Sequence, residues 1–238
     1  MSENNKVKRV MGIFAHPDDP EFFSGATFAR WAAEGAEIIF VLATSGDKGS
    51  ADPEMTSERL VQIREQEECN AAAVLGVKEV IFLRYTDGEL QPTLALRRDI
   101  VRLIRMKQPD VVVSCDPTVF WFLGRGINHP DHRAIGEAVL DAVYPTARDR
   151  LNFPELERDE GLPVHKVAQV YLAGTTTITK TVDVTAHVDT KVNALREHKS
   201  QIADMDAMAQ RVRERMLDEH APEDAPRYIE RFHVINLA

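Results

Sequence analysis

Short apolar runs alternate with longer helical patterns along most of this chain, and this alternation restricts its fold more than any other feature. Five runs rich in β-branched residues have the length of strands buried on both faces; they lie at 7–15, 38–44, 79–83, 110–115 and 167–173. Between them the spacing of apolar residues predicts helices at 24–33, 57–75, 94–106 and 131–143, with Gly76 ending the second. Strands that alternate with helices predict an α/β fold with a Rossmann-like, doubly wound and mostly parallel sheet.

The order of the strands in such a sheet predicts where a ligand binds. A five-stranded doubly wound sheet often has the order 3-2-1-4-5, which places the first and fourth strands side by side where the winding reverses. Ligands bind in the crevice at the carboxyl ends of these two strands. We therefore expect the functional residues directly after residue 15 and after residue 115.

The pattern changes after the fifth strand. A short extended piece is predicted at 181–184, a long amphipathic helix at 190–217, and a mixed stretch at 221–238 that wraps over the body. No internal repeat, low-complexity segment or Pro/Gly/Ser linker divides the chain. We expect a single domain over 1–238, with an α/β core at 1–175 and a C-terminal extension at 176–238 that contains the long helix.

Composition excludes several classes of function. The 238 residues carry a formal net charge of −9, which is unfavourable for binding a phosphate backbone, so we expect no nucleic-acid partner. No window is long and apolar enough to suggest a signal peptide or a membrane span. Cys69 and Cys115 lie far apart with no metal-ligand spacing, so a reducing cytoplasm is the expected location and no membrane partner is expected.

Two segments at the expected crevice contain the residues suited to chemistry. The first run of residues is Ala15-His16-Pro17-Asp18-Asp19-Pro20-Glu21, and the second is His129-Pro130-Asp131-His132. Imidazole and carboxylate are ligands of a catalytic Zn²⁺, for which two histidines and one aspartate suffice. The remaining carboxylate and histidine could transfer protons or stabilise an oxyanion. The residues alone leave open which histidine of the second segment is a ligand.

Each segment also has a purely structural interpretation. An aspartate pair after a strand often caps a helix, and Pro130 and Asp131 fit the first turn of one. Either segment taken alone is about as compatible with capping as with catalysis. Their joint position at the expected crevice favours the functional interpretation.

At these residues the chain resembles the LmbE-like, or PIG-L, family of metal-dependent deacetylases. The family motifs Ala-His-Pro-Asp-Asp and His-Pro-Asp-His are both complete, and the likeness continues through most of the chain; it includes Arg64 and Glu67, the stretch Ala71–Val77, Asp87–Leu90, Val182–Thr185 and His198–Gln201. Many members continue the first motif with an acidic residue, whereas this chain has Pro20 followed by Glu21.

The resemblance implies a role for each residue of the two motifs. It implies that His16, Asp19 and His132 bind the metal and that Asp18 is the general base. His129 would then polarise the substrate carbonyl or stabilise the oxyanion, while Asp131 fixes the tautomer and orientation of His129.

The activity implied by the resemblance is zinc-dependent removal of an acyl group, usually acetyl, from an N-acetylglucosamine-type amino sugar. The metal could be Zn²⁺ or Fe²⁺, since these ligands accept either. The small amino-sugar substrate is the expected partner, and assembly with further copies of the chain is compatible with the sequence. One alternative is an amidase acting on a thiol conjugate or a non-sugar acylamide. Another is a non-catalytic α/β module that holds a metal; Asp18 and His129 argue against it.

Four further residues are candidate substrate contacts. The resemblance places Arg64 and Asp87 near the sugar, and His198 in a family stretch on a helix that would ordinarily expose it. Trp121 belongs to the apolar run 119–123, which we expect either to form a substrate platform or lid, or to pack against a neighbouring subunit or the core. Cys115 ends the fourth strand close to the expected metal, but an inert buried thiol is the simpler interpretation.

Overall fold

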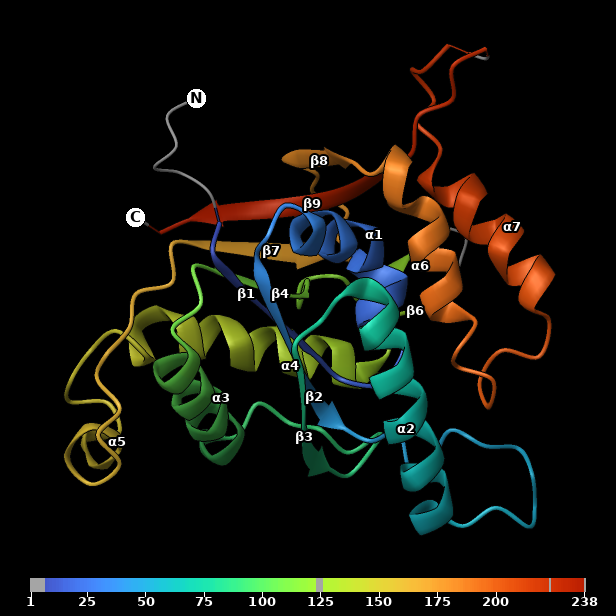
Figure 1. The fold of residues 1–238 in the computed structure, drawn as a ribbon. Coiled ribbons are helices and arrows are strands. Elements are labelled where there is room, and N and C mark those ends of the chain that lie inside the picture. Colours follow the sequence, from blue (N-terminus) through green and yellow to red (C-terminus); the bar gives the residue numbers. More distant parts are fainter. Residues whose placement is uncertain (1–6, 123–125, 223, 238) are drawn as a thin grey trace.

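The computed structural model describes residues 7–122, 126–222 and 224–237. Within them a seven-stranded sheet has the order β3-β2-β1-β4-β7-β9-β8 (Figure 1). Its strands are β1 (Arg9–Phe14), β2 (Glu37–Thr44), β3 (Glu79–Tyr85), β4 (Val111–Cys115), β7 (Gln169–Ala173), β8 (Lys180–Asp183) and β9 (Ile229–Asn236). The first five in this order are parallel to one another, and β9 and β8 are antiparallel additions. The predicted α/β class and the order 3-2-1-4-5 are therefore confirmed, with β7 as the fifth strand.

The helices form two groups, one on each face of the sheet. They are α1 (Asp19–Ala33), α2 (Ser57–Leu75), α3 (Leu94–Lys107), α4 (Pro130–Asp141), the short α5 (Pro154–Arg158), α6 (Val188–Leu195) and α7 (Met205–Met216). The first group consists of α1, α2 and α6, which pack against one another, and the second contains α3 and α4 (Figure 1). Right-handed crossovers produce this division, because the chain reverses its winding between β3 and β4.

Local sequence signals fix the ends of the helix α2. The hydroxyl of Thr56 accepts a hydrogen bond from the backbone N–H of Arg59 at 3.2 Å, as an N-cap does. Gly76 ends the helix in the left-handed conformation, with φ of 80°. The predicted range 57–75 is the observed one.

The single helix predicted over 190–217 is wrong. The structure has two helices there, α6 and α7, separated by residues 196–204. Neither glycine nor proline occurs in this connection, so the sequence contains no obvious helix breaker. Tertiary contacts of this connection compete with helix formation instead. Ser200 donates hydrogen bonds from its backbone N–H and its hydroxyl to the Glu67 carboxylate, at 2.8 and 2.6 Å.

The C-terminal stretch joins the sheet, rather than wrapping over the body as the sequence suggested. Glu230 on β9 is buried, and its carboxylate accepts hydrogen bonds from the backbone N–H groups of Ala26 and Thr27 in α1, at 3.2 and 2.8 Å. Lys191 on α6 pairs with the same carboxylate at 2.6 Å and donates to the Phe22 carbonyl at 2.8 Å. An ion pair from the C-terminal part thus holds the middle of α1.

A small hairpin lies between β4 and α4. Its strands are β5 (Trp121–Phe122) and β6 (Gly126–Ile127). Phe120, Trp121 and Ile127 are 54%, 64% and 88% exposed. Leu123, the last residue of the apolar run considered in the sequence, lies outside the described residues. An apolar surface therefore faces solvent beside the loop that leads into the second motif.

Among residues 7–122, 126–222 and 224–237, no helix has both the length and the apolar character needed to cross a bilayer.

Candidate active site

The first motif forms the sharp connection from β1 into α1. Asp18 adopts the left-handed conformation with φ of 89°, which an aspartate tolerates better than most residues. The next residue, Asp19, accepts a hydrogen bond from the backbone N–H of His16 through Oδ2 at 2.8 Å. This local contact fixes the Asp19 carboxylate against the His16 ring. The bend therefore directs the two neighbouring carboxylates to different surroundings.

The second motif brings a further imidazole to Asp19. His132 lies in the first turn of α4, and its Nε2 is 3.0 Å from Asp19 Oδ1. His16 Nδ1 is 3.3 Å from Asp19 Oδ2. The candidate ligand atoms of these three residues all lie within 4.8 Å of one another. Two imidazoles and one carboxylate at this spacing suit a transition-metal cation.

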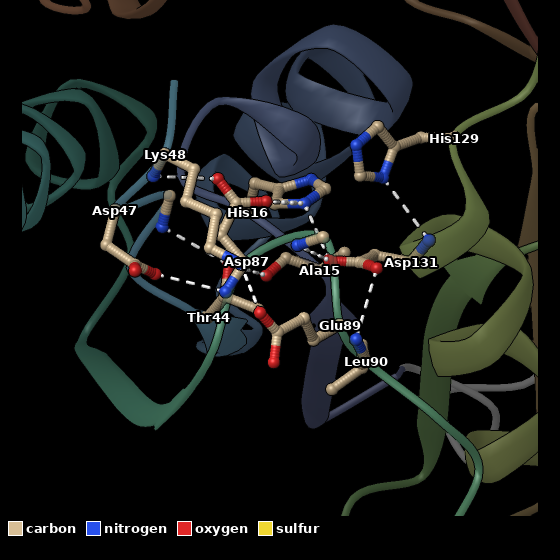
Figure 2. A network of polar contacts seen from close by, with 12 residues as sticks. Ala15, His16, Thr44, Asp47, Lys48, Asp87, Glu89, Leu90, His129 and Asp131 are labelled. Carbon is tan, nitrogen blue, oxygen red and sulfur yellow. Dashed lines mark hydrogen bonds and ion pairs between the residues drawn. The ribbon is translucent and has the colours of Figure 1, made fainter. Parts of the chain in front are cut away.

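The other ring nitrogen of each imidazole also has a polar partner. His16 Nε2 lies 3.1 Å from Asp87 Oδ1 and 3.3 Å from Asp131 Oδ2 (Figure 2). His132 Nδ1 lies 3.0 Å from Asn128 Oδ1. Acceptors behind the ring nitrogens orient metal-binding histidines and fix their tautomer. Asn128 was not identified from the sequence, although its position four residues before His132 placed it within reach of that ring.

The charges around His16 also suit a bound cation. Burial lowers the pKa of this imidazole, but the carboxylates of Asp19, Asp131 and Asp87 outweigh burial and raise the pKa to about 12. Burial raises the pKa of Asp19, and the two imidazoles reverse that effect and hold it well below its ordinary value. A pocket with such an excess of carboxylate favours any positive charge placed in it.

A second group of ligand atoms shares His16. It consists of His16, Asp87 and His129, whose candidate atoms also lie within 4.8 Å of one another. His129 is exposed, whereas His132 is partly buried and its distal nitrogen is held by Asn128. The group with Asp19 and His132 is therefore the better-organised of the two.

Asp18 lies beside the three candidate metal ligands without being one of them. Its carboxylate is 3.4 Å from the Arg64 guanidinium, and its backbone N–H donates to Glu68 Oε2 at 3.0 Å. Burial and the neighbouring Asp19 carboxylate raise the pKa of Asp18 to about 6, although Arg64 acts in the opposite direction. A carboxylate with such a pKa is ionised near neutrality yet basic enough to accept a proton.

His129 is the N-cap residue of α4, and its ring is oriented by the backbone. Nδ1 accepts a hydrogen bond from the backbone N–H of Asp131 at 3.2 Å (Figure 2). This bond assigns the proton of the neutral ring to Nε2. Partial desolvation of this exposed side chain lowers the pKa of His129, and the neighbouring His16 lowers it further. The ring is therefore a neutral donor.

The Asp131 carboxylate differs from expectation. Rather than orienting His129, it accepts hydrogen bonds from the backbone N–H groups of Gly88 and Leu90, at 2.7 and 3.3 Å, and faces His16. Of the role implied by the resemblance, only the backbone N–H of Asp131 contacts His129.

Arg64 and Asp87 both lie at this cluster. Arg64 is buried and donates to the backbone carbonyls of Pro17 and Gly46, at 2.7 and 3.1 Å. Gly46 allows this approach, because a Cβ on that residue would lie 2.1 Å from the guanidinium. Asp87 follows β3 and accepts a hydrogen bond from the backbone N–H of Lys48 at 3.2 Å.

The remaining candidates lie in different environments. His198 is 1% exposed and faces two glutamates behind Asp18, so its burial argues against the expected contact with substrate. Trp121 is exposed on the hairpin that precedes the second motif. Cys115 is buried, and burial raises the pKa of its thiol well above the ordinary value, as an inert residue requires.

Comparison with known proteins finds relatives that are named as deacetylases. The chain is 34% identical over 197 residues to diacetylchitobiose deacetylase of Thermococcus kodakarensis, covering 83% of this chain and 71% of the relative. It is 28% identical over 246 residues to 1D-myo-inositol 2-acetamido-2-deoxy-alpha-D-glucopyranoside deacetylase of Thermomonospora curvata, covering 82% and 81%. The solved N,N'-diacetylchitobiose deacetylase of Pyrococcus horikoshii superposes with a TM-score of 0.87 and 29% identity, over 99% of this chain and 88% of that one.

A family model supports the same grouping. The PIG-L model, described as GlcNAc-PI de-N-acetylase, matches residues 11–143, which include both histidine motifs and more than half of the chain. With the 34% identity to the Thermococcus protein, this match shows that the chain belongs to the PIG-L family.

Proposed function

We propose that this protein is a metal-dependent N-deacetylase that hydrolyses the amide of an N-acetylglucosamine-type amino sugar or conjugate. One observation carries the proposal. Asp18 and His129 flank a cluster of two imidazoles and a carboxylate at the carboxyl ends of β1 and β4. The relatives are named as deacetylases of acetylated amino sugars, which supports the same reaction class.

In this proposal His16, Asp19 and His132 hold the cation, which is Zn²⁺ or Fe²⁺. Their mixed nitrogen and oxygen donors suit both ions. A cation held there would supply a Lewis acid and lower the pKa of a water molecule. Asp87, Asp131 and Asn128 position the two imidazoles from behind.

Asp18 is the proposed general base. Its partly exposed carboxylate accepts a proton from the attacking water. The nearby Arg64 guanidinium keeps the carboxylate ionised, and its bonds to two backbone carbonyls hold it in place. Asp18 can then return a proton to the amide nitrogen as the bond to carbon breaks, which releases the amine and acetate.

His129 is the proposed oxyanion donor. The backbone N–H of Asp131 occupies Nδ1, so the proton of the neutral ring lies on Nε2 and is available to the carbonyl oxygen. As negative charge develops on that oxygen, the hydrogen bond strengthens and lowers the barrier.

Substrate contacts are proposed for Asp87 and Trp121, with Arg64 at the inner end of the site. The carboxylate of Asp87 can accept a hydrogen bond from a sugar hydroxyl. The exposed indole of Trp121 can stack on the apolar face of a pyranose ring. A cytoplasmic location, a single domain over 1–238 and assembly with further copies of the chain remain proposals from the sequence.

The decisive experiment measures amine release from a panel of acetylated compounds. The purified protein is assayed as isolated, after chelation, and after zinc or ferrous iron is restored. We expect turnover of N-acetylglucosamine compounds that disappears with the chelator and returns with the metal. Turnover unaffected by complete metal removal would refute the mechanism.

The panel also includes thiol conjugates and non-sugar acylamides, which separate the alternative activity from the proposed one. Hydrolysis restricted to these compounds would show that the same site is that of an amidase and not of an amino-sugar deacetylase. Binding of the metal without hydrolysis of any compound would favour a metal-holding module without catalysis.

A further inference from the structure

A second group of metal-ligand side chains lies behind the candidate active site. Glu21 from α1, Glu68 from α2 and His198 from the connection between α6 and α7 are 0%, 0% and 1% exposed. Their candidate ligand atoms lie within 4.8 Å of one another. The group shares no residue with the cluster of His16, Asp19 and His132, and the proposed reaction does not use it.

Four polar atoms of this group have no hydrogen-bond partner among the residues that the structure describes. They are both carboxylate oxygens of Glu21, Oε1 of Glu68 and Nε2 of His198. Unpaired buried polar atoms are costly and are rare in native proteins. Protonated carboxyl groups would pair these atoms only by donating to one another or to His198, and the 3.4 Å between His198 Nε2 and Glu21 Oε2 is longer than an ordinary O–H hydrogen bond.

A cation satisfies all four atoms at once. In a tetrahedral site with metal–ligand distances of about 2.1 Å, neighbouring donor atoms lie roughly 3.4 Å apart. His198 Nε2 is 3.4 Å from Glu21 Oε2. This separation is longer than an ordinary N–H···O hydrogen bond but has the length of an edge of such a site.

We propose that Glu21, Glu68 and His198 form a second, structural site for a divalent transition-metal cation such as Zn²⁺. Glu21 would bind as a chelating carboxylate through its two oxygens, Glu68 through Oε1 and neutral His198 through Nε2, which gives three ligand groups. The two carboxylates balance the charge of the ion, so the buried unit is neutral. All three side chains are inaccessible to a substrate, so the site fits a structural ion rather than a catalytic one.

The second ion would connect three segments that are distant in the sequence. Glu21 lies in the first turn of α1, Glu68 lies in α2, and His198 lies in the connection between α6 and α7. The second oxygen of Glu68, Oε2, accepts a hydrogen bond from the backbone N–H of Asp18, which holds the left-handed backbone of that residue. The site therefore secures the bend that carries the proposed base.

The test is zinc stoichiometry. The full chain is loaded with zinc, passed through a desalting column, and its bound metal is measured by mass spectrometry. We expect two zinc ions per chain for the wild type and one for Glu21→Gln and for His198→Gln. The control His132→Gln should lose the other ion and also retain one, and the double variant His132→Gln/His198→Gln should retain none.

A single zinc per wild-type chain that disappears in His132→Gln and persists in Glu21→Gln would overturn the second site. That result would leave the proposed deacetylase intact, so failure of the two proposals is distinguishable. Circular dichroism of every variant shows whether it is folded.

Anomalous diffraction of wild-type crystals at the zinc edge gives the same answer without a substitution. A peak between Glu21 and His198 supports the site. A peak only among His16, Asp19 and His132 refutes it, even if the variants do not fold.

Discussion

Asp18 and Asp19 are neighbours in the sequence, yet their surroundings give their carboxyl groups opposite properties. The imidazoles of His16 and His132 keep Asp19 ionised, whereas burial makes Asp18 more basic than an ordinary aspartate. The left-handed backbone at Asp18 separates them, because it turns one side chain toward the histidines and the other toward Arg64.

Replacement of the proposed base tests its role directly. Asp18→Asn preserves shape but removes the proton acceptor, so we expect kcat to fall by about 10²–10⁴-fold, as is typical of general bases. Metal content should not change, because Asp18 is not a proposed ligand. Steady-state kinetics and metal analysis measure both quantities, with Asp52→Asn on the surface as the control. A loss of less than a few-fold would assign the base to another residue.

Arg64 provides a test by pH. A base acts only when deprotonated, so kcat/KM should fall as the pH decreases through the pKa of Asp18, which burial raises to about 6 and a bound cation would lower. Arg64 lowers this pKa. In Arg64→Gln the acid limb of the profile should therefore move to higher pH, and Arg64→Lys, which keeps the charge, should move it less. An acid limb that stays in place in Arg64→Gln would contradict this link.

At the level of single residues, the two motifs were sufficient to predict which histidines and aspartates the fold brings together. The residues that hydrogen-bond to these side chains from behind could not be predicted. Side chains that meet only in the folded chain, such as Glu21 and His198, leave no pattern in a single sequence, because their spacing of 177 residues has no local meaning. The orientation of Asp131 was missed for a related reason. Its carboxylate accepts hydrogen bonds from the backbone N–H groups of residues 88 and 90. Such groups are present whatever side chains these residues carry, so the sequence contains no signal for the contact.

Among the elements, the β5–β6 hairpin is the one most exposed beside the site. Trp121 pairs with Ile127 across it, and Arg133 lies over the Phe120 ring at 4.6 Å from its centroid. This cation–π contact fixes the base of the hairpin to α4, which also carries His132. The hairpin is thus attached to the same helix as a proposed metal ligand.

Removing the indole should weaken substrate binding more than catalysis. Stacking of an aromatic ring contributes about 0.5–1.5 kcal/mol, so in Trp121→Ala we expect KM to rise by about 2–12-fold with kcat nearly unchanged. Leu94→Ala is the matched control, since Leu94 is 69% exposed on α3. Initial-rate kinetics on the best substrate of the panel decide the matter. An unchanged KM would remove Trp121 from the binding site.

Elements were predictable where their own residues determine them. Strands β1, β2 and β4 are almost entirely apolar and buried, and the helix α2 has its own caps. The break between α6 and α7 was not predictable, because contacts with α2 outweigh a local preference for helix. Asp204 is the one local signal, since its side chain caps α7 by accepting the backbone N–H of Ala207 at 2.9 Å.

In the whole molecule, the buried pair of Lys191 and Glu230 joins the C-terminal part to α1. Both side chains are 3% exposed. Lys191→Met leaves a buried carboxylate without its partner, and we expect the free energy of unfolding to fall by about 3–5 kcal/mol. The double variant Lys191→Met/Glu230→Gln should recover part of the loss, because it removes the unpaired charge. Chemical denaturation measures both, and equal stability of Lys191→Met and the wild type would contradict the prediction.

The parallel core could be predicted from the sequence because alternating strands and helices leave few ways to connect them. The extended piece predicted at 181–184 is β8, but its pairing and the strand β9 could not be predicted, since such short mixed sequences match many surface segments. Their place at the edge beyond β7 depends on pairing with residues far away.

The contact between Glu230 and α1 has a consequence for how the protein is made. Two backbone N–H groups in α1 can contact the Glu230 carboxylate only when residue 230 is present, although α1 begins at residue 19. On the ribosome both histidine motifs emerge before residue 230, so α1 gains these two hydrogen bonds only after β9 has been made. A chain interrupted before residue 230 therefore lacks both the carboxylate that these two N–H groups contact and the buried partner of Lys191.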